Sequence, residues 1–214
     1  MPLIYHKQLP NHTQMGVWKV EESIDDLKSR LILDEKELAF YKSLNKGKRN
    51  LHWLSGRVLI RNLLNTYHFI EVRSDECGKP HLVNFDYELS ISHSQEYAAV
   101  IISKKRVGID IEQIRPKIRR IAHKFMREEE QAILSDNEET AIRQMYVIWT
   151  GKEALYKLYG KRKLNFREHM QFEPFELGSP GSARGWLLKN DERKAFVVTF
   201  EELDGYMMAY TIEE

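Results

Sequence analysis

The chain has 214 residues, of which 42% are hydrophobic, enough to bury the core of one large domain or of two small ones. Lys and Arg number 33 and Asp and Glu 32, so with a formal net charge of +1 no global field favours nucleic acid or a membrane surface. The single cysteine, Cys77, excludes an intramolecular disulfide and a cysteine-based structural zinc site, which indicates a reducing, cytoplasmic compartment.

No segment predicts export or membrane insertion. The first ten residues, MPLIYHKQLP, lack a basic stretch followed by an apolar core. The longest aliphatic run, 98–102, is far too short to cross a bilayer. We therefore expect no leader peptide and no membrane-spanning segment.

The first half of the chain is predicted to place helices before strands. Residues 15–20 predict a short strand, and Asp34 is a suitable N-cap for an amphipathic helix that opens a helical hairpin. Apolar residues recur every three and four positions over 48–68, which predicts a long helix with one buried face. After the turn at 77–80, three strands are predicted: 88–94, 97–103 and 107–112.

The second half repeats this order. A short helix is predicted over 128–134 and a long one over 138–159. A polar turn at 190–191 separates the first two of three late strands. These strands are predicted at 183–189, 195–200 and 206–212.

The repeated order indicates an α/β (α+β) fold made of two similar halves. Each half would be a long helix packed on a small, mainly antiparallel sheet, and the two would be related by a pseudo-twofold arrangement. We expect an N-terminal half over 1–105 and a C-terminal half over 106–214. A ligand site between such halves is the natural place for convergent polar groups.

The segment 107–112, VGIDIE, carries two acids. Strict alternation places Gly108, Asp110 and Glu112 on one strand face and the three aliphatic residues on the other. Two carboxylates at this spacing are hard oxygen ligands suited to a magnesium ion that completes its shell with water and substrate phosphates. A half-exposed strand with a solvated polar face gives the same pattern and, on this segment alone, is the commoner explanation.

The segment 149–157, WTGKEALYK, lies within the second long helix. Glu153 and Lys157 are four residues apart on one helix face, so they could contact one ligand together or simply pair with each other. The simple pair is the commoner case. Gly151 favours a site slightly, because a glycine inside a helix often marks a close approach.

Two further segments contain groups that suit a phosphate. His93 shares the strand face of Leu89 and Ile91, where a histidine is more often a core residue, although at a strand end it could donate to a phosphate. Lys79 stands in the Gly-Lys-Pro sequence at 78–80, which is typical of a tight turn. A lysine on a rigid turn is nevertheless a good point charge for a phosphate.

Two local basic runs stand out despite the neutral balance of the chain. Solvated helix faces are the commoner explanation of both. In functional terms, one run could hold a phosphate-rich ligand and the other an acidic protein partner. The first run is Lys46, Lys48, Arg49, Arg57 and Arg61, and the second is Arg115, Lys117, Arg119, Arg120 and Lys124.

The order of these segments is more specific than any one of them. GKP (78–80), SISHS (90–94), GIDIE (108–112), FMREEE (125–130) and WTGKEALYK (149–157) follow one another along the chain. Together they resemble the 4′-phosphopantetheinyl transferases, in particular their long, monomeric, surfactin-synthetase-activating type. The resemblance covers about residues 46–160, and only a compatible strand-rich tail follows.

The resemblance implies a metal site. In this family the two acids of the GIDIE segment and the glutamate of the KEA segment bind magnesium, which implies Asp110, Glu112 and Glu153 here; manganese would also fit such ligands. Within FMREEE, Glu129 is the expected match to a family glutamate, although Met126 replaces the serine that usually precedes it.

The resemblance also implies contacts to coenzyme A. Lys79 and Pro80 match the turn beside the adenosine, and the other candidates are assigned to the phosphates. Arg49 and Arg57 are included because WLSGR (53–57) is similar to a family segment. The full set is Arg49, Arg57, Lys79, Pro80, Ser92, His93 and Lys157.

The implied reaction is magnesium-dependent transfer of the 4′-phosphopantetheine arm of coenzyme A to a serine of an apo acyl or peptidyl carrier protein, with release of 3′,5′-ADP. Glu153 or a water on the metal would accept the serine proton, while Lys157 and His93 stabilise the departing charge. Because carrier proteins are acidic near the modified serine, the basic segment 115–124 is the expected dock.

Two other classes stay open at this point. Paired carboxylates with a helical glutamate and lysine could also build a metal-dependent phosphohydrolase or nuclease. No basic and aromatic groove in the sequence supports that class. A chain that only binds a carrier protein or a nucleotide is the non-enzymatic alternative, and the intact set of three acids argues against it.

Overall fold

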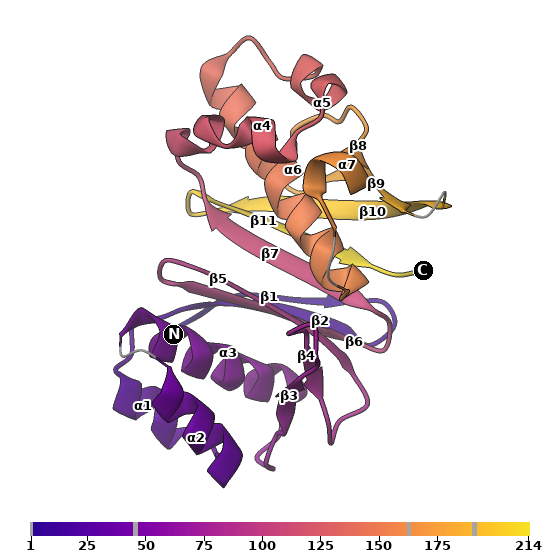
Figure 1. The fold of residues 1–214 in the computed structure, drawn as a ribbon. Coiled ribbons are helices and arrows are strands. Elements are labelled where there is room, and N and C mark those ends of the chain that lie inside the picture. Colours follow the sequence, from indigo (N-terminus) through magenta and orange to yellow (C-terminus); the bar gives the residue numbers. More distant parts are fainter. Residues whose placement is uncertain (1, 45–46, 162–163, 190–191) are drawn as a thin grey trace. The chain divides into compact units, whose positions relative to one another are not determined.

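The computed structural model describes residues 2–44, 47–161, 164–189 and 192–214. The chain forms two compact units, Met1–Lys105 and Arg106–Glu214, and each unit contains an antiparallel sheet and one long helix (Figure 1). The expected mixed α/β class with antiparallel sheets is confirmed. The turn predicted at 190–191 and Lys46 of the first basic run lie outside the described residues.

The first unit contains a four-stranded sheet in the order β1-β2-β6-β5 and a separate hairpin, β3-β4. The helix α3 (Lys48–Leu64) packs on this sheet, beside the short helices α1 (Ile24–Ser29) and α2 (Glu35–Ser43) (Figure 1). The strands are β1 (Leu3–Leu9), β2 (Thr13–Lys19), β3 (Val72–Ser74), β4 (Pro80–Leu82), β5 (Glu88–Ser94) and β6 (Tyr97–Ser103).

Local signals in the sequence explain how the helices of the first unit begin and end. Asp34 caps α2 by accepting from the backbone N of Glu37 at 2.7 Å, as its N-cap assignment predicts. The apolar face of α3, with Leu54, Val58 and Leu59, packs into the core on β6. The helix ends four residues before the predicted limit because Asn65 adopts a left-handed conformation with φ 46°.

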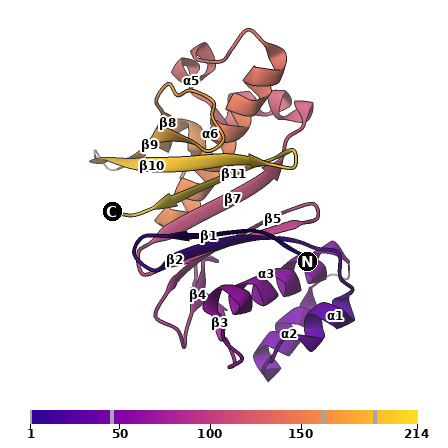
Figure 2. The ribbon, with the colours of Figure 1, turned by 180° about the vertical axis from the view of Figure 1, so that it is seen from behind.

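The second unit contains a five-stranded sheet in the order β7-β11-β10-β9-β8. The strands β9, β10 and β11 are seen from the other side in Figure 2. They are β7 (Val107–Gln113), β8 (Met170–Phe172), β9 (Gly181–Lys189), β10 (Glu192–Leu203) and β11 (Tyr206–Ile212). The helices are η1 (Pro116–Arg120), α4 (Ala122–Phe125), α5 (Glu128–Ala132), α6 (Glu138–Tyr159) and α7 (Phe166–His169).

The long helix α6 has the bounds that the sequence predicts, and both of its ends are capped. Asn137 accepts from the backbone N of Thr140, and Gly160 ends the helix with φ 68°. Arg106 donates from Nη2 to the carbonyls of Leu158 and Tyr159, each at 2.8 Å. A cation on these last carbonyls also complements the helix dipole.

The contact between α6 and β7 is unusually close because a glycine lies beneath the helix. A Cβ atom added to Gly108 would lie 1.9 Å from the carbonyl oxygen of Ala154 and 2.8 Å from the backbone N of Leu158. Gly108 therefore lets the helix backbone rest directly on the strand. This places the strand face that carries the acids against α6.

Several short elements were not predicted from the sequence. These are β1, α1, β3, β4, η1, α4, α7 and β8, all of seven residues or fewer. None of the helices in the described residues is both long enough and apolar enough to span a bilayer.

Gly108→Ala should lower the free energy of unfolding by at least the roughly 1–3 kcal/mol typical of overpacking, because the added methyl meets backbone rather than a movable side chain. Urea denaturation of both proteins measures the difference. The matched control is Gly56→Ala, whose methyl meets only side chains and gains about 1 kcal/mol of helix propensity. Equal stability of Gly108→Ala and wild type would show that α6 and β7 can separate without cost.

Candidate functional site

Four of the predicted residues lie close together in the second unit, on β7 and α6. Because Gly108 faces α6, the alternation of β7 turns Asp110 toward the helix as well. Lys157 donates from Nζ to Asp110 Oδ1 at 2.8 Å and to the carbonyl of Ile109 at 3.0 Å. The pair that the sequence suggests for Lys157 is with Glu153 on the same helix face, whereas the ion pair observed is with Asp110.

Glu153 lies one helical turn before Lys157 and shares this acidic environment. Burial raises the pKa of Glu153 to about 7, and the negative charge of Asp110 adds to the increase. Lys157 opposes the shift, and Glu112 contributes a smaller increase. The carboxylates of Asp110, Glu112 and Glu153 therefore act on one another electrostatically, with the Lys157 ammonium among them.

The geometry is not that of an assembled metal centre. Among the described residues, no group of three or more His, Cys, Asp or Glu side chains is arranged to hold a metal ion. The chemistry of the donor set does fit a divalent cation, because three carboxylates offer hard oxygen ligands, and Asp110 and Glu112 add to the increase in the pKa of Glu153 that burial produces. Lys157 contacts Oδ1 of Asp110, so an ion bound there would share this carboxylate with Lys157 or replace that contact.

A buried ion pair supports the residue next to Glu153. Lys152 is fully buried and donates from Nζ to Glu130 Oε2 at 2.6 Å and to the carbonyl of Phe125 at 2.7 Å. Glu130 also accepts from the backbone N of Phe172 at 2.8 Å. Burial lowers the pKa of Lys152 to about 8, against the opposing effect of Glu130. The pair ties α4, α5 and β8 to α6.

This pair shows which glutamate of the FMREEE segment is buried, while the expected match of Glu129 to a family glutamate stays a prediction. The side chain of Glu129 is 69% exposed, whereas Glu130, one residue later, is completely buried. The glutamate with a structural role is therefore Glu130. A lysine on the core face of a helix needs a buried partner of opposite charge. The position of Lys152 in the helical pattern therefore indicates a buried acid, and 128–130 contains three candidates.

The first unit contains a cavity of about 600 Å³ at α2, α3 and the β3-β4 hairpin. Of the predicted coenzyme A contacts, Arg57, Pro80 and His93 line it. Residues that the sequence did not single out also line it, including Lys36, Phe40, Trp53 and Arg73. Phe40 is 53% exposed on an amphipathic helix, and an exposed aromatic side chain of this kind can indicate a binding surface.

The other predicted contacts in this unit do not line the cavity. Lys79 lies in the turn before β4 and pairs with Glu88 at 3.6 Å. Arg49 is exposed in the first turn of α3. Ser92 lies on the face of β5 opposite to His93, as the strand alternation predicts.

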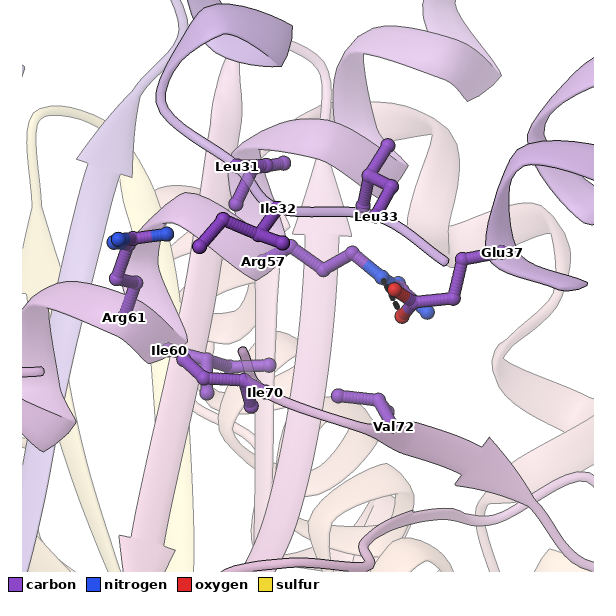
Figure 3. Close-up of a pocket in the computed structure, with 9 residues that line it drawn as sticks. All are labelled: Leu31, Ile32, Leu33, Glu37, Arg57, Ile60, Arg61, Ile70 and Val72. Atoms are coloured by element: carbon purple, nitrogen blue, oxygen red, sulfur yellow. Dashed lines mark hydrogen bonds and ion pairs between the residues drawn. The ribbon is translucent and has the colours of Figure 1, made fainter. Parts of the chain in front are cut away.

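Arg57 forms part of the cavity wall through internal contacts. Its Nε donates to Glu37 Oε1 at 3.2 Å, and its guanidinium carbon lies 3.5 Å from the ring centroid of Trp53. Burial lowers the pKa of Arg57 to about 10 and raises that of Glu37. A small hollow beside the pair is lined mostly by aliphatic side chains, namely Leu31, Ile32, Leu33, Ile60, Ile70 and Val72 (Figure 3). Glu37 therefore offsets the positive charge of Arg57, the residue that was expected to contact a phosphate of coenzyme A.

Arg57→Ala should lower the free energy of unfolding by about 3–5 kcal/mol, because it leaves the Glu37 carboxylate buried without its cation. The double variant Glu37→Leu/Arg57→Met should recover most of this loss, since it removes both charges and keeps apolar volume. Urea denaturation of the three proteins tests both statements. A single variant as stable as wild type would mean that the pair is not formed in solution.

Glu153→Gln should change how stability depends on pH. Folded Glu153 holds its proton to about pH 7, whereas the unfolded residue releases it near 4.5, so wild-type stability falls as pH rises through this window. The glutamine variant does not titrate, and its stability relative to wild type should therefore rise from pH 4.5 to 7 and then stay level.

Denaturation in chelator at several pH values gives this difference, and exposed Glu129→Gln is the matched control. Magnesium added at pH 7.5 should stabilise wild type more than Glu153→Gln, if the carboxylates bind it. A constant difference across pH would contradict the burial of Glu153.

Comparison with known proteins adds a separate line of evidence. The family model of the 4′-phosphopantetheinyl transferase superfamily matches residues 106–211, nearly all of the second unit. The 4′-phosphopantetheinyl transferase gsp of Aneurinibacillus migulanus is 34% identical over 149 residues, which are 67% of this chain and 62% of that protein.

Two further relatives are more distant. The 4′-phosphopantetheinyl transferase psf-1 of Bacillus pumilus is 31% identical over 50% of this chain and 49% of its own length. The 4′-phosphopantetheinyl transferase Sfp of Bacillus subtilis (strain 168) is 29% identical over 50% of this chain and 51% of its own length. The chain thus spans 49–62% of the lengths of these three curated relatives. With the family model and these relatives in agreement, the chain belongs to the 4′-phosphopantetheinyl transferase superfamily.

Proposed function

We propose that this protein transfers the 4′-phosphopantetheine arm of coenzyme A to a serine of an apo acyl or peptidyl carrier protein and releases 3′,5′-ADP. The observation that carries the proposal is the set of Asp110, Glu112, Glu153 and Lys157 on β7 and α6. These residues lie in the part of the chain that matches the family. The relatives carry the name of this activity.

Asp110, Glu112 and Glu153 would hold a magnesium or manganese ion. The ion would supply positive charge for the pyrophosphate of coenzyme A. Lys157 is the cation that the chain itself offers beside these acids, and we assign it to the phosphates. When the ion engages Asp110, the Lys157 ammonium would become available for this contact.

The transfer itself is a displacement at the β-phosphorus of coenzyme A. The serine oxygen forms the new bond to phosphorus in line with the anhydride oxygen, whose bond breaks, and 3′,5′-ADP leaves with that electron pair. Glu153 is a suitable acceptor for the serine proton, because its pKa of about 7 matches the operating pH of a general base.

The cavity of the first unit is the candidate site for the nucleotide portion of coenzyme A. Its volume of about 600 Å³ and its mixture of Trp53, Phe40 and charged side chains suit an aromatic base with phosphates. His93 is the imidazole in the lining and is assigned to a phosphate. Arg57 contributes to the wall, where Glu37 engages its Nε and Trp53 lies against its guanidinium, so the phosphate contact assigned to Arg57 would be made by its Nη groups.

An acidic carrier protein would dock on the basic segment of η1 and α4. Arg115, Lys117, Arg120 and Lys124 are exposed there, whereas Arg119 also reaches Glu138 at 3.3 Å. Complementary charge favours the encounter and sets the orientation of the partner.

Intact-mass analysis of an apo acyl carrier protein tests the proposal directly. Wild type with coenzyme A and magnesium should add about 340 Da, the size of the arm transferred by this phosphoryl chemistry. Asp110→Asn should abolish the addition because it removes a ligand charge but keeps the shape of the side chain. Circular dichroism should show that this variant is folded.

Other outcomes would change the assignment. Release of free phosphate from coenzyme A without a change in carrier mass would favour a phosphohydrolase. Coenzyme A binding without turnover on several unrelated carriers would favour a binding protein.

A further inference from the structure

One face of α3 is built around the ring of His93. Lys48, His52 and Gly56 recur every four residues and therefore share this face. A Cβ atom on Gly56 would lie 3.3 Å from His93 Nε2, so the glycine leaves room for the imidazole. One turn earlier, the ring of His52 stacks on His93 with centroids 5.1 Å apart and planes 15° apart.

The ring of His52 is itself held in place. Its Nε2 lies 2.6 Å from the carbonyl oxygen of Gln95, and because a carbonyl only accepts, Nε2 carries the proton. Lys48, one turn before His52, donates to the side-chain oxygen of the same Gln95 at 3.3 Å. The turn between β5 and β6 thus fixes His52, and His52 in turn provides a flat surface for His93.

The two rings line different cavities. His93 lines the cavity of about 600 Å³, whereas His52 lines a separate one of about 150 Å³ together with Lys48, Gln95 and Glu96. A ligand in the larger cavity would therefore meet His93 and not His52. Any effect of His52 on that ligand must pass through His93.

We propose that His52 is a positioning residue for coenzyme A binding, which it promotes by holding the His93 ring in the orientation that donates to a phosphate. This inference rests on the proposed function, because it takes coenzyme A as the ligand of the larger cavity. The physical reason is preorganisation: stacking restricts rotation of the His93 side chain on folding, so less rotational freedom is lost on binding. The effect should appear in binding more than in the chemical step.

Two matched substitutions separate the stack from the hydrogen bond. His52→Phe keeps an aromatic face for His93 and loses the Nε2 donor, whereas His52→Asn keeps a donor and loses the ring. We expect His52→Asn to raise the KM and Kd for coenzyme A about tenfold, with kcat within about twofold, and His52→Phe to restore most of the affinity. Steady-state transfer assays and calorimetric titration with coenzyme A measure these constants.

A double-mutant cycle tests whether His52 acts through His93. In a His93→Ala background, His52→Asn should cause no further loss of coenzyme A affinity, because the ring that it orients is gone.

The results distinguish the inference from the proposed function. If wild type transfers the arm but His52→Asn binds coenzyme A normally, or if both His52 variants weaken binding equally, the positioning role is wrong and the function stands. A loss in His52→Asn that persists undiminished without His93 also contradicts the role. If wild type neither binds coenzyme A nor modifies any carrier, the proposed function fails and the inference fails with it.

Discussion

The direct contact between the backbones of α6 and β7 at Gly108 is the constraint on which the acidic site depends. Without a side chain at this position, the helix rests on the strand, and the alternation of β7 then presents Asp110 to the helix. Lys157 can reach Asp110 at 2.8 Å only because the two elements lie this close. The same proximity places Glu153 in the field of the strand carboxylates, which contributes to its raised pKa.

Each unit also contains a buried ion pair close to its functional residues. Lys152 and Glu130 are both completely buried in the second unit, and Arg57 and Glu37 are nearly so in the first. Such pairs add little net stability, because desolvation offsets most of their attraction, but they penalise any arrangement that separates the charges. They therefore favour one arrangement of the helices that carry Glu153 and line the cavity.

Periodicity was sufficient to predict the elements that carry the acids. Alternation over 107–112 gave β7, and the helical pattern over 138–159 gave the bounds of α6. The ion pair of Arg57 could not be predicted, because its partner Glu37 is 20 residues away on another helix. The register that buries Glu130 rather than Glu129 depends on where α5 begins. His52 escaped notice because its stacking partner lies on a strand 41 residues later, at a distance that no local pattern reports.

The burial of Lys152 has a consequence for the dynamics of the second unit. Its amine has four acceptor oxygens within hydrogen-bonding distance, on α4, α5, α7 and β8, and the side chain has no exposed surface. An acylating reagent can therefore reach this amine only when those segments move away from α6. The rate at which Lys152 is acylated in the native protein therefore measures how often α4, α5, α7 and β8 separate from α6 next to Glu153. Lys152 is thus a probe of local unfolding in the second unit.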